Sequence, residues 1–442
     1  MDRDIQGILE RDNPWLADRG RIRDWLQMRV PAPYVPRKAV SQAAPRWRET
    51  DRAHLVVGPR QAGKSTAIWR YLSDVGEPVL FVDCEQRLVR DWCSSASLVL
   101  SDLKGLVERP VSLFFEEAQH LDEAGLFFKG LVDRKPGVPI LVTGSSSFHL
   151  HARTRESLAG RATRTRLLPF ALAEVLYDLT EKPEAIRRRL MEERLVRHVT
   201  VGGYPRVWLS EAPQVLLTDL VEAIILRDAS DLYRIGRPDA FRRLLRLAAT
   251  QVGNRVNFSE WASIVGISRD TVASYLEILE SSHVLSILPP FAGGKRVEVT
   301  STPKVFFIDN GVRNRLLHDF KPLDSRTDKG AALENWVFTE LWKCLPDGGT
   351  LHFWRSSSGA EVDFVMVRGE LIVAVEVKAE TLRRATIPRA SRSFVDAYSP
   401  RTLFLVNAGL EASERLKDTD VEWLQPQDLA ARIEEVFKLG LS

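Results

Sequence analysis

The chain has 442 residues, of which 44% are hydrophobic and 27% are charged, a composition that is typical of folded globular proteins and excludes wholesale disorder. At about 150 residues per domain, this length predicts about three domains. The 62 basic and 59 acidic residues leave a net charge of +3, so any basic patch is local. Two arginine-rich segments, 151–166 and 383–392, are candidates for contact with phosphate groups or are simply solvated surface.

The sequence also bears on where the protein works. No apolar run approaches the roughly 20 residues that a membrane span needs, and the amino-terminal residues lack the apolar core of a secretory signal. The three cysteines, Cys84, Cys93 and Cys344, show no C-x-x-C spacing, which argues against a disulfide framework and a zinc site. We therefore expect a cytoplasmic protein without a membrane partner.

The pattern along the chain predicts an α/β organisation. Residues 1–45 contain short stretches of helical periodicity and a proline-rich connector, so we expect a helical segment and a linker. In residues 46–172, near-continuous apolar runs alternate with helix-length segments, which is typical of a parallel sheet buried on both faces, here with about five strands. Residues 173–236 show helical periodicity alone and predict a helical lid.

A phosphate-binding loop follows the first apolar run. The sequence GPRQAGKST fits G-x-x-x-x-G-K-[ST] and lies between a predicted strand and a predicted helix, which is the context this motif requires. Lys64 would reach the β- and γ-phosphates, and Ser65 would supply a hydroxyl to Mg²⁺. No N-K-x-D element for guanine follows, so ATP is favoured over GTP. The expected nucleotide-binding residues are Gly58, Pro59, Arg60, Gln61, Ala62, Gly63, Lys64, Ser65 and Thr66.

Acidic residues end another apolar run, in VSLFFEEAQH. Glu116 is suited to the Mg²⁺ shell, although Asp is the usual residue there, and Glu117 is suited to polarising the attacking water. The next strand ends at Thr143 and leads into Ser145, Ser146 and Ser147. A hydroxyl there could sense the γ-phosphate, or the segment could be a plain serine turn.

These elements resemble the AAA+ ATPases, and more closely the bacterial and archaeal ATPases that carry a C-terminal restriction-nuclease-like domain. The resemblance rests on GPRQAGKST, FFEEAQHL, VTGSSS, SLAGR, GGYP and GAEVDFV…AVEVK, and it covers residues 50–380. It implies a homo-oligomer, a hexameric ring with a nucleotide at each subunit boundary. In that setting Arg161 resembles an arginine finger or a sensor, with Arg164 and Arg206 as alternatives.

Residues 237–302 resemble a winged helix. The expected helix-turn-helix has a first helix ending at Gly266 and a second capped by Ser268. Its exposed face would offer Arg269, Asp270, Thr271 and Ser274 to a DNA groove, and Lys295 and Arg296 in the wing would contact phosphates. Many winged helices bind proteins instead.

A third constellation occupies residues 303–442. Asp363 lies on one predicted strand, and Glu376 and Lys378, two positions apart on the next, share a face. The pattern resembles the PD-(D/E)xK nucleases with Val362 before the aspartate, and Glu334 matches their additional acid. Glu334, Asp363 and Glu376 would hold Mg²⁺ or Mn²⁺, and Lys378 would position or deprotonate the water that cleaves a phosphodiester. A chance strand hairpin and a nuclease fold without turnover are the alternatives.

The expected fold is therefore α/β: a P-loop AAA+ core with a helical lid, a winged-helix domain and a C-terminal restriction-nuclease-like α/β domain. The preferred function is ATP hydrolysis coupled to work on DNA, as a ring motor that remodels or translocates branched or duplex DNA, with metal-dependent cleavage as a further activity. One alternative is a regulatory nucleotide switch whose C-terminal domain is inert and serves docking. Another is a DNA-binding regulator that uses ATP only structurally.

Overall fold

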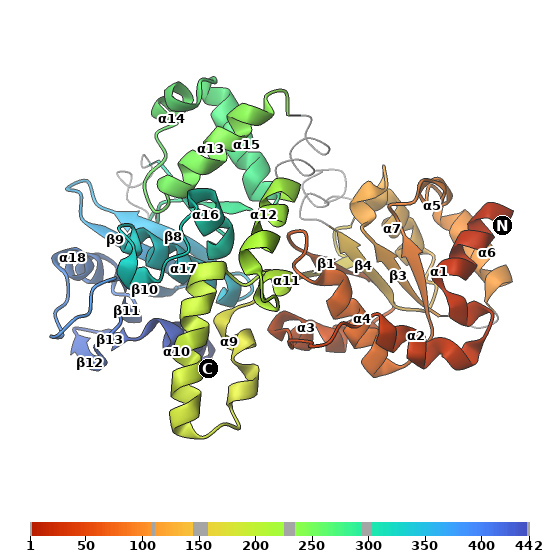
Figure 1. Ribbon diagram of the computed structural model, residues 1–442, viewed down its shortest axis with the longest axis horizontal. Helices are drawn as coiled ribbons and strands as arrows, with labels where there is room; N and C mark the ends of the chain where they lie inside the picture. Colours follow the sequence, from red (N-terminus) through yellow and green to blue (C-terminus); the bar gives the residue numbers. More distant parts are fainter. Residues whose placement is uncertain (1, 108–110, 145–157, 225–234, 294–301, 440–442) are drawn as a thin grey trace. The chain divides into compact units, whose positions relative to one another are not determined.

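The computed structural model describes residues 2–107, 111–144, 158–224, 235–293 and 302–439. It packs as two compact units, which are described separately (Figure 1). Unit 1 consists of residues 1–169 with 281–283, and unit 2 consists of residues 170–280 with 284–442. The expected five-part division stays a prediction, and the boundary between the two units after residue 169 lies close to the boundary expected after residue 172. In the described part of the chain, no helix has both the length and the apolar character needed to cross a bilayer.

Unit 1 is built on a parallel sheet, which confirms the prediction for this part of the chain. Its strand order is β2-β3-β4-β1-β5, and every paired neighbour is parallel. The strands are β1 (Ala53–Val57), β2 (Val79–Asp83), β3 (Ser112–Glu116), β4 (Ile140–Gly144) and β5 (Ala162–Arg166). The helices are α1 (Arg3–Asp12), α2 (Ile22–Met28), α3 (Lys38–Ala43), α4 (Lys64–Val75), α5 (Arg87–Trp92), α6 (Ala96–Leu106) and α7 (Ala124–Asp133).

Neighbouring residues of β3 show why the sheet needs helices on both faces. Successive side chains of a strand point to opposite faces. Phe114 packs against Trp69 of α4, whereas Phe115 packs against Phe127 and Phe128 of α7. All of these rings are buried, so the continuous apolar run in the sequence reflects burial on both faces of the sheet.

The amino-terminal segment packs as part of unit 1. Ile5, Leu9 and Trp25 belong to the same buried core as the sheet. Beyond α1, the Asn13 side chain accepts a hydrogen bond from the N–H of Phe81 (2.7 Å) and donates one to the carbonyl of Phe81 (2.9 Å). Trp15 Nε1 donates to the carbonyl of Val79 (2.9 Å). The strand β2 lies at the edge of the sheet and has no neighbouring strand on one side. The side chains of Asn13 and Trp15 provide hydrogen-bond partners for its backbone groups on that side.

We expect Asn13→Ala to lower the free energy of unfolding of unit 1 by about 2–3 kcal/mol, because the N–H and the carbonyl of Phe81 would be buried without partners. Urea denaturation measures the change. Gln6→Ala, at an exposed position of α1, is the control, and its free energy of unfolding should change by no more than about 0.5 kcal/mol. If the two variants lose equal stability, Asn13 does not secure the sheet edge.

Unit 2 begins with helices that were expected to form a lid of the ATPase core. In the structure α10 (Glu184–Val201) and α12 (Pro213–Ala223) pack on α16 (Asn310–Leu317), and all three belong to unit 2. The assignment of residues 173–236 as a lid stays a prediction. The shorter helices of this region are α9 (Leu172–Val175) and α11 (Pro205–Trp208).

A three-helix group with a small sheet follows, in which α13 (Pro238–Thr250), α14 (Phe258–Val265) and α15 (Arg269–Ser281) precede β6 (Leu285–Leu288) and β7 (Lys304–Phe307). The expected turn is present, because α14 ends at Gly266 in the left-handed conformation and the Ser268 hydroxyl accepts the N–H of Thr271 (3.1 Å). The strand β7 pairs antiparallel with β6. The boundary expected at residue 302 therefore cuts through this sheet, and the wing residues Lys295 and Arg296 lie outside the described residues.

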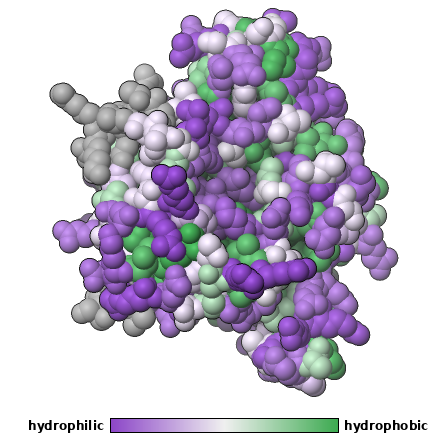
Figure 2. Space-filling view, turned by 90° about the vertical axis from the view of Figure 1, so that its left-hand side faces the viewer, coloured by the Kyte–Doolittle hydropathy of each residue, from purple (hydrophilic) through white to green (hydrophobic). Residues whose placement is uncertain are grey.

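The remainder of unit 2 is a mixed sheet of strand order β12-β13-β11-β10-β9-β8, in which β9 is antiparallel and β11 parallel to β10. The strands are β8 (Thr350–Arg355), β9 (Glu361–Arg368), β10 (Leu371–Val377), β11 (Thr402–Val406), β12 (Ala412–Leu416) and β13 (Thr419–Leu424). The helices are α17 (Lys329–Cys344), α18 (Arg389–Tyr398) and α19 (Leu429–Leu439). In Figure 2 hydrophilic residues cover most of the face shown, and the apolar residues form separate patches, as on ordinary soluble surfaces.

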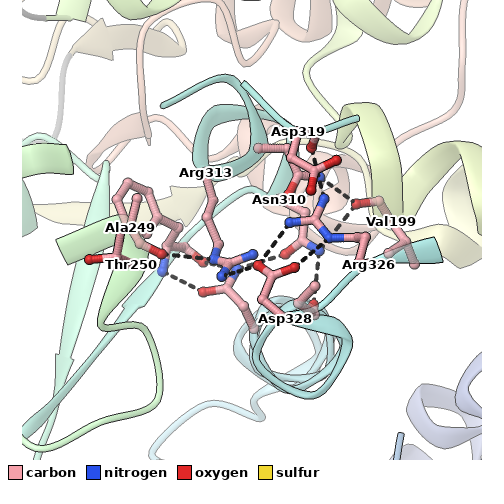
Figure 3. A network of polar contacts seen from close by, with 12 residues as sticks. Val199, Ala249, Thr250, Asn310, Arg313, Asp319, Arg326 and Asp328 are labelled. Atoms are coloured by element: carbon pink, nitrogen blue, oxygen red, sulfur yellow. Dashed lines mark hydrogen bonds and ion pairs between the residues drawn. The ribbon is translucent and has the colours of Figure 1, made fainter. Parts of the chain in front are cut away.

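Buried charge joins the helices of unit 2 (Figure 3). Arg313 on α16 is 1% exposed, donates to the Ala249 carbonyl (3.2 Å) and pairs with Asp328 (2.7 Å). Arg326 also pairs with Asp328 (2.8 Å) and donates to the carbonyl of Asp319 (2.8 Å). Burial alone would raise the pKa of Asp328, but the two arginines outweigh it and hold the pKa at about 2. The carboxylate is therefore charged at neutral pH and links α13, α16 and the start of α17.

A buried histidine completes this core. His198 Nε2 lies 2.8 Å from the carbonyl of Phe170, and Trp336 Nε1 donates to His198 Nδ1 (2.9 Å). The neutral ring with its proton on Nε2 satisfies both partners. Burial lowers the pKa of His198 to about 4, with the charge of Lys343 adding to the shift.

Acid should therefore destabilise unit 2 through His198. Its pKa is about 4 in the fold and near 6.5 when unfolded, so the stabilisation is complete above pH 6.5 and is lost as the pH falls toward 4. Between pH 7 and pH 5 we expect the His198 contribution to fall by about 2 kcal/mol, measured by urea unfolding as the difference in pH dependence between the wild type and His198→Gln. His198→Gln should lack this pH dependence. His318→Asn, at an exposed helix end, should show the same pH dependence as the wild type. An identical loss in wild type and His198→Gln would contradict this assignment.

Candidate nucleotide site and carboxylate cluster

The predicted phosphate loop lies at the carboxyl end of β1. The strand ends at Val57, and α4 begins at Lys64, so the loop residues connect the sheet edge to a helix amino terminus. The first turn of any helix leaves N–H groups without acceptors in the helix, and these groups suit a phosphate. Lys64 is buried and its Nζ donates to the carbonyls of Gly58 (3.2 Å) and Pro59 (3.0 Å). The lysine therefore lies over the loop that would hold the phosphates.

Two neighbours fix the shape of this loop. A Cβ on Gly58 would lie 2.0 Å from the carbonyl oxygen of Leu167, so only glycine fits beside the residue that follows β5. Buried Arg37 donates to the carbonyl of Ala62 (2.9 Å) and to that of Leu168. The sequence analysis missed Arg37. Its position in the proline-rich segment, far from the motif, gave no signal of this contact.

The expected Mg²⁺ ligands come together at the sheet edge. Glu116 ends β3, and its carboxylate receives a hydrogen bond from the side chain of Ser65 on α4. Burial raises the pKa of Glu116, and the Ser65 hydroxyl partly opposes this rise. A hydroxyl and a carboxylate in contact are oxygen donors of the kind that Mg²⁺ takes beside nucleotide phosphates, so these residues fit the ion. Mg²⁺ bound here would neutralise charge on the phosphates.

Glu117 follows in a constrained position. It has a positive φ of 53°, and its N–H donates to the hydroxyl of Thr143 at the end of β4 (3.0 Å). The ligand atoms of Glu85, Glu117 and His120 lie within 4.8 Å of one another, and among the described residues no other His, Cys, Asp or Glu trio does so. The hydrogen bond from the N–H of Glu117 to Thr143 positions the backbone of Glu117. The other expected phosphate sensors, Ser145 to Ser147, lie outside the described residues.

Arg161 lies at the opposite end of β1 from the phosphate loop. Its carbonyl accepts the N–H of Ala53, the first residue of β1, whereas the loop follows the last residue of that strand. Its guanidinium pairs with Asp133 (2.6 Å). The full length of β1 therefore separates Arg161 from the phosphate loop of its own chain, which argues against a sensor acting within one subunit. Arg164 and Arg206 are exposed.

The residues of the nuclease-like pattern meet in unit 2. Asp363 on β9 and Glu376 on β10 are on adjacent antiparallel strands, and Asp363 Oδ2 accepts the N–H of Val377 (2.8 Å). Lys378 Nζ pairs with Glu376 Oε1 (2.6 Å), as expected of side chains that share a face. Glu376 is 6% exposed, and its Oε2 is buried without a hydrogen-bond partner. An orphaned carboxylate oxygen beside a second carboxylate fits a cation site.

Additional charged residues enter this cluster from other elements. Lys304, the first residue of β7, pairs with Glu361 Oε1 (2.5 Å) and with Glu334 Oε1 on α17 (3.5 Å). Glu361 also accepts from Arg355 (2.6 Å). Lys304 and Glu361 were missed from the sequence. Glu361 lies two positions before Asp363 on one strand, so strand periodicity could have found it. Lys304 begins a strand whose pairing with β6 is shown only by the fold.

Burial dominates the ionisation of this cluster. It raises the pKa of Glu334 to about 8 and that of Glu376 to about 7, and in both cases Asp363 adds to the rise while the nearest lysine opposes it. For Lys304, burial lowers the pKa, but Glu334 and the other carboxylates outweigh this effect and raise the pKa. The ammonium of Lys304 is therefore retained at neutral pH.

Three segments of the chain match models of protein families. Residues 50–176 match the model described as "AAA domain". Residues 192–323 and 329–425 match two domains of unknown function, DUF8612 and DUF4143. The first of these spans β7, and the second begins at α17. The chain thus carries an AAA-type ATPase domain, and the match supports ATP hydrolysis.

The curated relatives include an uncharacterised protein of Methanocaldococcus jannaschii, MJ1544, 24% identical over 72% of this chain and 72% of its own length. An uncharacterised protein of Mycobacterium tuberculosis, Rv2008c, is 26% identical over 78% of this chain and 73% of its own. Among solved structures, the Walker-type ATPase PABY2304 of Pyrococcus abyssi is similar at 16% identity and a TM-score of 0.44, covering 65% of this chain and 97% of that chain.

Proposed function

We propose that this protein hydrolyses ATP and couples hydrolysis to work on DNA as a homo-oligomer. The contact between Ser65 and Glu116 supports the first part of this proposal, because it brings together two oxygen donors of the kind that Mg²⁺ takes beside nucleotide phosphates. Lys64 binds the phosphates, and Glu117 orients the attacking water. The buried position of Lys64 and the backbone contact of Glu117 with Thr143 hold these side chains in place.

Two features of unit 2 support DNA as the partner. The turn between α14 and α15 is short, and the side chains at the start of α15 are exposed, namely Arg269, Asp270 and, one turn later, Ser274. Such a helix can enter a groove, as in winged-helix proteins. The segment 383–392 adds four exposed arginines after β10, which suit backbone phosphates. The arginines of 151–157 lie outside the described residues.

The position of Arg161 favours an oligomer. It lies away from the phosphate loop of its own chain, and it is only partly buried in its pair with Asp133. A guanidinium in that place can stabilise transition-state charge only at a nucleotide of a neighbouring subunit. We therefore propose that Arg161 acts as an arginine finger in a ring, which the resemblance to AAA+ proteins implies to be a hexamer.

We expect ATP hydrolysis that DNA stimulates and that Lys64→Ala lowers by roughly a hundredfold or more, because the β- and γ-phosphates lose their cation. Phosphate release with and without linear, forked and four-way DNA measures both effects. Lys104→Ala, on the exposed side of α6, is the control and should keep the wild-type rate. Turnover that is indifferent to every DNA would contradict the DNA partner, and wild-type turnover in Lys64→Ala would contradict the assigned site.

A second function for the carboxylate cluster is metal-dependent DNA cleavage. Asp363 and Glu376, with Glu334, would hold Mg²⁺ or Mn²⁺, which would activate water, and Lys378 would position that water. The alternative function is that of a nucleotide switch, in which this domain has no catalytic activity and serves for docking. It is favoured by the lysine pairs of the cluster, because Lys304 and Lys378 already engage Glu334, Glu361 and Glu376.

Cleavage of DNA in Mg²⁺ or Mn²⁺ separates these readings. If the cluster is catalytic, Asp363→Ala and Lys378→Ala should each lower cleavage by roughly a hundredfold, because they remove a metal ligand and the water-positioning group. Asp347→Ala, on an exposed loop, is the control and should keep full cleavage. If the wild type cuts none of the linear, forked and four-way substrates, the inert docking domain is the correct reading.

A further inference from the structure

The carboxylate cluster receives its most buried cation from outside its own sheet. Lys304 is the first residue of β7, which pairs with β6 in the small sheet that follows α15. Its side chain is 2% exposed and its Nζ lies 2.5 Å from Glu361 Oε1 and 3.5 Å from Glu334 Oε1. Nζ also lies 5.3 Å from the centre of the Phe353 ring. The ammonium is thus enclosed by carboxylates and an aromatic face, the arrangement of a bound cation.

The backbone around Lys304 is fixed by the segment between α13 and α14. The N–H of Val256 donates to the carbonyl of Pro303 (2.8 Å), and the N–H of Gly253 donates to that of Val305 (3.1 Å). A Cβ on Gly253 would lie 2.8 Å from Glu334 Oε2, so this segment also abuts the cluster. The small sheet of β6 and β7 therefore supplies the cation, and α17, β9 and β10 supply the acids.

The carboxylates are held apart in this arrangement. Glu334 and Glu361 are paired with Lys304, and Glu376 Oε1 is paired with Lys378. Within the described parts of the chain, the trio Glu334, Asp363 and Glu376 does not bring its oxygens within 4.8 Å of one another. Yet Glu376 Oε2 is buried and unpartnered. Glu376 Oε2 is therefore available, while one oxygen of each of Glu334, Glu361 and Glu376 is engaged by an ammonium group.

We propose that the Lys304 ammonium is a tethered counter-ion of this cluster that competes with a divalent cation for Glu334. The inference rests on the cation site proposed above. Binding of Mg²⁺ or Mn²⁺ then requires Glu334 to exchange its ammonium partner for the metal. Because Lys304 is anchored in the small sheet, the position of β7 sets how strongly the cluster can take a metal.

Mn²⁺ binding to the full-length protein tests this proposal, with free Mn²⁺ measured by its electron paramagnetic resonance signal. Nucleotide is omitted, and Ser65→Ala is present in every variant so that the phosphate-loop site does not contribute. Lys304→Met should bind Mn²⁺ at least roughly tenfold more tightly than the Lys304 protein, because a competing positive charge is removed from the carboxylates. Asp363→Asn added to Lys304→Met should abolish the gain.

Two further variants distinguish competition between Lys304 and the metal ion from a general effect of breaking a buried ion pair. Lys343→Met breaks a comparably buried pair with Glu340 away from the cluster, and it should leave Mn²⁺ affinity unchanged. If Lys304→Met folds poorly, the double variant Lys304→Met with Glu361→Gln removes the pair together and should still bind Mn²⁺ more tightly.

Each remaining outcome overturns the counter-ion role. Equal, measurable Mn²⁺ affinity with and without Lys304, lost on Asp363→Asn, would leave the cation site standing and refute competition. A lack of Mn²⁺ binding in every variant would refute both the competition and the proposed cation site. The ATPase proposal would be unaffected in either case, because it depends on unit 1.

Discussion

The hydrogen bonds that hold β1 between β4 and β5 are the constraint on which the nucleotide site depends. They continue past the strand, because the N–H of Leu167 donates to the carbonyl of Val57 (2.8 Å), and they bring the Leu167 carbonyl against Gly58. These contacts therefore fix the direction in which the phosphate loop leaves the sheet. The same parallel register sets the end of β3, with Glu116, at the edge from which α4 departs with Ser65. The site is a consequence of strand register and needs no separate scaffold.

The parts of this fold that sequence could predict are those encoded locally. The buried runs of β1, β3 and β4 and the glycine-rich loop are contiguous, so the parallel sheet and the position of Lys64 could be read directly. Asp363, Glu376 and Lys378 were recoverable because strand periodicity fixes which side chains share a face. The role of Asn13 at the edge of β2 was not recoverable, because it depends on a partner 68 residues away.

Domain boundaries were harder to predict, because they depend on which partner each element finds. The strand β7 is apolar and precedes α16, so by sequence it groups with the C-terminal sheet, but its hydrogen bonds go to β6. The helices α10 and α12 have an ordinary helical pattern, which does not show that α16 is their partner. The charge network of Arg313, Arg326 and Asp328 that secures α16 is also formed from separated residues.

The two acidic sites differ in how their charge is balanced. At the sheet edge of unit 1, Glu116 receives a hydrogen bond from a neutral hydroxyl, and the charge of Arg29 makes only a small contribution to its ionisation. In unit 2, the chain supplies its own ammonium groups, and the acids are compensated in the fold as it stands. Without such partners, the charge of buried Glu376 and of the half-buried acids beside it would be uncompensated, which is costly. The lysines that stabilise the cluster are therefore also the groups that a metal ion must displace.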